Sequence, residues 1–110
     1  MTEQPDALNE YTALLTEGGR RAHPSWIIKS YEHTETRNGI AFTCQLEAAG
    51  EIVADVEQGG NGGATTLYWT QAADQDGTKG RFEAEAASIF PNDFKADGTL
   101  VEALLTRQGL

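Results

Sequence analysis

The sequence contains only one cysteine, Cys44, so no disulfide can form within the chain. Cys44 lies among alternating apolar residues, where a free cysteine usually packs as a small hydrophobic group. The two histidines, His23 and His33, have no Cys or His at the spacing that metal ligands require. We therefore expect no metal, no cofactor, no catalytic residue and a reducing, cytoplasmic compartment.

Long apolar runs and basic residues are also scarce. No segment approaches the roughly 18 apolar residues of a membrane span, and the first ten residues lack the basic start and apolar centre of a signal peptide. There are 8 Lys and Arg against 17 Asp and Glu, which gives a net charge of −9. This balance argues against binding to nucleic acid, whose phosphates require Lys and Arg, and against docking on an anionic membrane.

The acidic charge leaves two interpretations open. In the first, the charge keeps the surface of a soluble protein from aggregating. In the second, an acidic face competes with nucleic acid for a basic protein. Charge alone favours the first interpretation.

The order of hydrophobic patterns predicts one domain over residues 1–110. Residues 5–17 predict a helix that ends at Gly18 and Gly19. Four strands are then expected over 25–36, 40–48, 51–58 and 65–71, a loop over 72–80, and two helices over 80–90 and 99–108. The expected fold is α+β: a four-stranded antiparallel meander with three helices, in the order α-ββββ-α-α and in two layers.

Strand pairing follows from Asn38-Gly39, a strong signal for a two-residue hairpin turn. With this turn, Arg37 pairs with Ile40, and His33 lies opposite Cys44. In the third strand, the alternation turns Ile52, Ala54 and Val56 inward, and Glu51, Asp55 and Glu57 outward. Trp26 and Trp69 are expected in the core, while Tyr31 and Tyr68 are expected on the outer face beside acidic residues.

A glycine-rich loop follows the third strand, with Gly59, Gly60, Gly62 and Gly63 around Asn61. A phosphate-binding loop opens into a helix and often carries a lysine, whereas this loop opens into a strand. No Lys or Arg occurs between Arg37 and Lys79. We therefore expect a wide hairpin turn, or a loop tip that contacts a partner.

The strand end Val-Ala-Asp-Val-Glu, residues 53–57, is followed by Gly-x-x-Gly-Gly and then by Tyr68. This pattern resembles small uncharacterised phage and plasmid proteins in which the strand end reads Val-Glu-Asn-Asp-Gly-x-Gly-Gly. Val56, Glu57, Gly62 and Gly63 match, whereas Gly59 stands where an acid is expected. The resemblance covers residues 46–68 and implies a mobile-element origin with a small accessory role, without transferring an activity or a catalytic residue.

These observations predict a non-enzymatic accessory protein that binds, and inhibits or modulates, a host or defence protein with a basic surface. The predicted contact residues are Glu47, Glu51, Asp55, Glu57, Asn61 and Tyr68, together with the loop glycines Gly59, Gly60, Gly62 and Gly63. A homodimer through a sheet edge is a further expectation. The alternatives are a small-ligand-binding or hydrolytic domain with the glycine loop as a lid, and a virion or assembly component.

Overall fold

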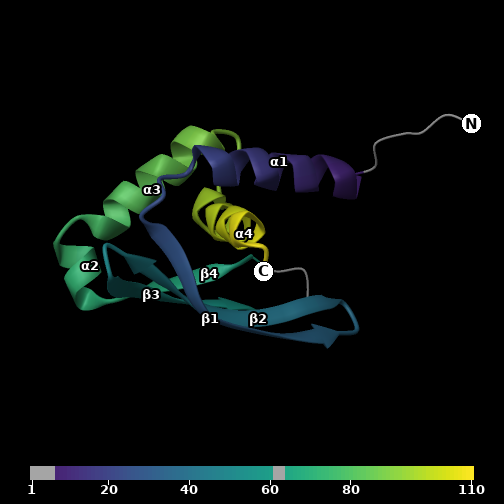
Figure 1. Cartoon of the computed structure of the whole chain (residues 1–110), viewed down its shortest axis with the longest axis horizontal. Coiled ribbons are helices and arrows are strands. Elements are labelled where there is room, and N and C mark those ends of the chain that lie inside the picture. The colour runs from purple at the N-terminus through teal and green to yellow at the C-terminus, as the bar shows by residue number, and fades with distance from the viewer. Residues whose placement is uncertain (1–6, 61–63) are drawn as a thin grey trace, which may run out of the picture.

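The computed structural model describes residues 7–60 and 64–110, and it confirms the α+β fold (Figure 1). Four antiparallel strands lie in the order β1-β2-β3-β4. The strands are β1 (Trp26–Thr36), β2 (Gly39–Ala48), β3 (Glu51–Gln58) and β4 (Thr66–Trp69). The helices are α1 (Ala7–Arg21), α2 (Gln71–Gln75), α3 (Thr78–Ile89) and α4 (Ala96–Gln108). The sequence pattern did not predict the short helix α2, which Thr70 caps by accepting a hydrogen bond from the Ala73 N–H.

The β1–β2 hairpin turns one residue earlier than Asn38-Gly39 predicted. Thr36 pairs with Gly39, so the two turn residues are Arg37 and Asn38. The Thr36 hydroxyl stabilises this turn, because its oxygen accepts from the Asn38 N–H at 3.3 Å and it donates to the Gly39 carbonyl at 2.7 Å.

The expected proximity of His33 and Cys44 is consequently wrong. His33 pairs with Phe42, and its ring stacks on Tyr31 at 5.4 Å between centroids. Cys44 instead lies opposite an irregularity of β1 and is buried.

Two β-bulges interrupt the alternation that the sequence suggests. In β1, Ser30 and Tyr31 lie between the paired residues Lys29 and Glu32, and Ser30 has a φ of 55°. The inserted residue turns Tyr31 towards the helices, where its ring lies tilted against that of Phe42, so the expectation that Tyr31 lies on the outer face is wrong.

The second bulge lies at Val53 in β3, between the pairs that Leu46 and Glu47 make. It buries Val53 and leaves Ile52 38% exposed, so the expectation that Ile52 points inward is wrong. A single inserted residue reverses the side on which all following side chains of a strand lie.

The helices cover one face of the sheet, and α4 lies between α1 and the strands (Figure 1). Helix α1 does not end at Gly18 and Gly19 but continues to Arg21. A Cβ atom on Gly18 would lie 2.4 Å from the Phe90 ring, and one on Gly19 would lie 2.7 Å from the Ala103 carbonyl oxygen. The two glycines therefore permit close packing of α1 against its neighbours rather than terminating the helix.

The core forms between the helices and the covered face of the sheet. Its largest fully buried side chains are Phe82, Leu46, Leu100, Leu104, Val56 and Val101. Trp26 and the partly buried Trp69 meet the edge of the Phe82 ring, as expected for core residues. This arrangement leaves the opposite face of the sheet uncovered by the described helices.

Candidate functional site

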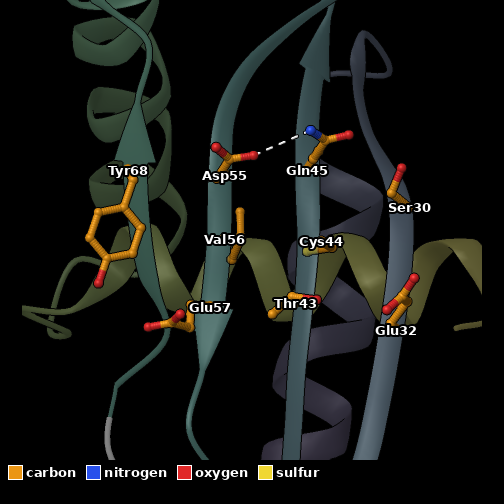
Figure 2. Close-up of a pocket in the computed structure, with 9 residues that line it drawn as sticks. All are labelled: Ser30, Glu32, Thr43, Cys44, Gln45, Asp55, Val56, Glu57 and Tyr68. Carbon is orange, nitrogen blue, oxygen red and sulfur yellow. Dashed lines mark hydrogen bonds between the residues drawn. The ribbon is translucent and has the colours of Figure 1, made fainter.

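The uncovered side of the sheet, which we call the outer face, carries a shallow depression of about 490 Å³. Its lining comes from all four strands, and the helices lie behind the sheet in Figure 2. The lining residues are Ser30, Glu32, Thr43, Cys44, Gln45, Asp55, Val56, Glu57 and Tyr68. Cys44 and Val56 are buried, so the polar members of this set form the accessible surface.

The strand register explains why these polar residues lie together. One row of paired residues crosses the sheet from Glu32 through Thr43 to Glu57. The next row runs from Lys29 through Gln45 and Asp55 to Tyr68. Directly paired residues of antiparallel strands have side chains on the same face, about 4.5–5.5 Å apart at Cβ. The sheet thus holds three carboxylates and one phenol on a single surface.

The carboxylates of Glu32, Asp55 and Glu57 form no ion pair with any residue in the described part of the chain. The ion pair within the described residues joins Arg20 to Glu17 at 3.4 Å, and both of these residues belong to α1. Asp55 accepts a hydrogen bond from the Gln45 side-chain amide at 3.3 Å, drawn as the dashed line in Figure 2. The carboxylates of this face are therefore exposed and form no ion pair within the described residues, although Lys29 lies on the same face, opposite Gln45.

Three of the predicted contact residues meet in this depression. Asp55 and Glu57 project from alternate positions of β3, and Tyr68 lies beside Asp55 on β4 with 56% of its surface exposed. Glu47 pairs with Ile27 and Ile52, beyond the lining of the depression.

Glu51 does not follow the predicted alternation. It pairs with Ala48, which packs against the core, so the register places Glu51 on the helix side at the end of the sheet. The cause is the bulge at Val53, which lies between Glu51 and Asp55. Glu51 and Asp55 therefore do not share a face.

Glu32 is a member of the acidic surface that the sequence did not indicate. In an uninterrupted strand Glu32 would lie on the same side as Trp26 and Ile28, which are buried. The bulge at Ser30 and Tyr31 turns it to the outer face instead. Neither residue is a glycine, so the sequence carried no strong signal for the bulge.

The described part of the glycine loop is anchored to the β1–β2 hairpin. Gly60 is buried, and its N–H donates to the Gln58 side chain at 3.2 Å. Its carbonyl lies 3.0 Å from the Thr36 hydroxyl, whose one proton is shared between the Gly39 and Gly60 carbonyls. A Cβ atom on Gly60 would lie 2.8 Å from the Ala41 nitrogen. The start of the loop thus rests on the first residues of β2, while the predicted contacts Asn61, Gly62 and Gly63 lie outside the described residues.

A second hollow of about 560 Å³ lies between α1, α4 and the far half of the β1–β2 hairpin. Its apolar lining includes Leu15, Tyr31, Phe42 and Leu105. Glu102 contributes a carboxylate at its border, which accepts hydrogen bonds from the hydroxyls of Tyr11 and Thr65. Burial and the hydrogen bond to Glu102 raise the pKa of Tyr11 above its ordinary value.

The thiol of Cys44 has the properties of a packing group. Desolvation by burial raises its pKa from the ordinary 9.0 to about 11, so the thiol stays protonated at neutral pH. Within residues 7–60 and 64–110, no group of three or more His, Cys, Asp or Glu side chains is placed to hold a metal ion. Neither feature supplies a reactive centre on the outer face.

No protein-family model matches the chain, and no match was found among curated proteins or solved structures. Among the helices of the described residues, none has the length and apolar character needed to cross a membrane.

Proposed function

We propose that this protein is a non-enzymatic accessory protein of the cytoplasm that binds a basic surface of another protein through its outer face and thereby inhibits or modulates it. The observation that supports this proposal is the group of exposed carboxylates from Glu32, Asp55 and Glu57, none of which forms an ion pair within the described residues. Exposed, unpaired charge of one sign attracts and orients a partner of opposite charge, and its effect weakens as salt is added.

The sheet suits such a role because it holds the charges in fixed positions. Side chains on paired strands keep their spacing, so a partner can place Lys or Arg against Glu32, Asp55 and Glu57 with little ordering of the surface. Tyr68, beside Asp55, offers an aromatic ring and a hydroxyl, a combination common at protein interfaces. Electrostatic attraction would set the rate and orientation, and Tyr68 would add buried contact area.

The sequence supports the proposed class of partner. The similarity of residues 46–68 to a pattern in small phage and plasmid proteins supports a host or defence protein as the partner. The net charge of −9 favours a protein over nucleic acid. A single free cysteine that is buried is compatible with the reducing cytoplasm.

The decisive experiment reverses the charge of the outer face. The triple variant Glu32→Lys, Asp55→Lys, Glu57→Lys is compared with Glu10→Lys, Asp74→Lys, Glu83→Lys, which changes the net charge equally at exposed positions on helices. Proteins captured from a host lysate are identified by mass spectrometry, and the affinity of the captured partner is then measured at several salt concentrations. We expect the control to retain the partner and the outer-face variant to lose at least about tenfold in affinity. Retention of the partner by the outer-face variant would refute the proposal.

The apolar hollow beside Gly60 supports a second candidate, the binding of a small ligand. Its volume of about 560 Å³ falls in the range of small-molecule sites, and Tyr11 and Glu102 lie at its border. Leu15→Arg would introduce a charged side chain into this hollow while leaving the outer face unchanged. If the protein's effect on its host is lost in Leu15→Arg but kept in the outer-face variant, the ligand-binding candidate is the correct one.

A further inference from the structure

We propose that the chain forms a symmetric homodimer in which residues 31–37 at the free edge of β1 pair antiparallel with the same residues of a second copy. This inference concerns the edge of the sheet and is independent of the proposed role of the outer face. It rests on three features of β1: which part of its edge is blocked, how its backbone is directed, and how its charges are spaced.

The first part of the β1 edge is blocked by the end of α4. The side-chain amide of Gln108 accepts from the Ile28 N–H at 2.6 Å and donates to the Ile28 carbonyl at 3.0 Å. Arg107 donates to the Trp26 carbonyl at 2.6 Å. These bonds occupy the groups through which another strand would add to the sheet at this point.

The remaining part of the edge is open. Residues 32–36 are all exposed, and Tyr31 is only partly buried. Within the described part of the chain, no hydrogen bond from outside the sheet reaches the backbone of residues 31–36. Such an uncapped edge presents N–H and C=O groups to a further strand.

The direction of the backbone identifies the groups that are free. The backbone N–H and C=O of Ile28 point away from β2, because both groups bond to Gln108 although Ile28 pairs with Leu46. Alternation along β2 then directs Gly39, Ala41 and Thr43 towards β1, since β2 is regular over this range. Their partners Thr36, Thr34 and Glu32 bond to β2, so His33 and Glu35 direct their N–H and C=O groups outward.

The order of side chains makes this open edge complementary to itself. Pairing must bring outward-facing residues together, which restricts the symmetric registers to those centred on a residue. Centred on Thr34, the dimer pairs His33 with Glu35 twice, Glu32 with Thr36, and Tyr31 with Arg37. An imidazole opposite a carboxylate can donate a hydrogen bond to it, and an arginine beside a tyrosine ring adds a further attraction.

The registers centred on Glu32, His33 or Glu35 lack this complementarity, and one centred on Thr36 pairs Glu35 with Arg37 but involves a shorter part of the open edge. Centring the dimer on Glu32 or on Glu35 places identical carboxylates directly opposite one another, and centring it on His33 places two imidazoles opposite one another. Like charges at paired positions destabilise a sheet. The length of the open edge also fits, because the turn of the second copy ends beside Ser30, before the blocked residue Ile28.

The pairing joins the two sheets into one continuous sheet with a two-fold axis perpendicular to it at Thr34. This symmetry keeps the helices of both copies on one side and both outer faces on the other. The dimer therefore doubles the acidic surface without covering Glu32, Asp55 or Glu57 of either copy.

Disulfide trapping tests the register directly. In Thr34→Cys the two new thiols face each other at a position where paired Cα atoms are about 4.5 Å apart, which suits a disulfide. In the control Glu32→Cys, at an exposed position, the new thiol faces Thr36 of the second copy. Cys44 is buried and common to both variants. We expect mild oxidation to give covalent dimer with Thr34→Cys and little with Glu32→Cys; equal yields from the two would overturn the register.

Charge exchange tests the interaction without a covalent bond. Sedimentation equilibrium gives the dimer dissociation constant of the wild type, His33→Glu, and the exchanged variant His33→Glu, Glu35→His. Repulsion at two symmetric pairs is expected to weaken the dimer about tenfold in His33→Glu, and the exchange should restore it. The control Ser88→Glu adds the same charge on α3 and should leave the constant unchanged. A wild-type chain that stays monomeric at all concentrations, or an exchange that fails to restore association, would refute the proposal.

Discussion

The side-chain amide of Gln108 bonds to the backbone of Ile28 as a neighbouring strand would. Its oxygen accepts from the Ile28 N–H at 2.6 Å, and its nitrogen donates to the Ile28 carbonyl at 3.0 Å. A residue at the end of the last helix thereby completes the hydrogen bonding of the first strand. Arg107, the preceding residue, reinforces the same junction. The C-terminal turn of α4 consequently joins elements that are far apart in the sequence.

The first prediction concerns Gln108. Gln108→Ala removes both bonds to Ile28, whose backbone lies in a partly buried position. We expect the free energy of unfolding to fall by about 1–2 kcal/mol, because two polar groups lose their partner. Urea denaturation measures this change. Thr106→Ala serves as the control, since the Thr106 hydroxyl is exposed and bonds only to the Glu102 carbonyl of its own helix; an equal loss in both variants would contradict the role of Gln108.

The second prediction concerns Arg107, whose guanidinium donates to several backbone carbonyls where α1 leads into β1. These carbonyls belong to Gly19, Ala22, His23 and Trp26. Lysine lacks the planar fork that reaches several acceptors at once, so Arg107→Lys should destabilise the fold by about 2 kcal/mol. The exposed Arg20→Lys should change stability by less than about 0.5 kcal/mol. Thermal unfolding of the two variants compares them, and similar melting temperatures would show that the bonds of Arg107 contribute little.

The third prediction concerns Gly60, which has a φ of 77° and contacts the backbone of β2. Gly60→Ala adds a Cβ atom 2.8 Å from the Ala41 nitrogen, so it combines backbone strain with a steric clash. Gly50→Ala, at a φ of 87° with nothing within 4 Å, reports the backbone strain alone. We expect the loss of unfolding free energy in Gly60→Ala to exceed that in Gly50→Ala by about 1–3 kcal/mol. If the two losses are equal, Gly60 is not packed on β2.

The fourth prediction concerns the pH dependence of stability through Cys44. The native thiol has a pKa of about 11 against 9.0 for an ordinary cysteine, so the unfolded chain loses its proton first. Its contribution to stability is complete below pH 9.0 and disappears as the pH rises to about 11. Cys44→Ala should therefore lose less stability than the wild type over this interval, as measured by denaturation at each pH.

Burial also raises the pKa values of Tyr11 and Tyr31. The stability of Cys44→Ala will therefore still depend on pH in the alkaline range. An independent measurement uses a thiol-reactive disulfide reagent, which should modify native Cys44 slowly and the unfolded chain rapidly. Rapid modification of the native protein at neutral pH would contradict the burial of this thiol.

The class of fold was predictable because alternating apolar residues and turn signals specify strands without reference to the rest of the chain. Asp55, Glu57 and Tyr68 were placed on one face by the same alternation, and the structure brings them together. The roles of these residues in binding stay predictions.

The sequence failed where local pattern and tertiary packing disagree. The bulges at Ser30 and Val53 depend on how β1 and β3 fit their neighbours, and neither carries a glycine to mark it. Gly18 and Gly19 have the composition of a helix end, yet they are needed where α1 approaches Phe90 and Ala103. The close approach of α1 to these residues exists only in the folded protein, and the hydrophobic periodicity of the sequence does not indicate it.

The bulge in β1 also has an evolutionary consequence. The residues that follow it owe their side of the sheet to the length of the strand rather than to their own chemistry. Removal of Ser30 would restore simple alternation, bringing His33 to the outer face and turning Glu32 towards the helices. A deletion of one codon would thus exchange the two sides of β1 beyond the bulge in a single step, whereas substitutions would have to rebuild them residue by residue.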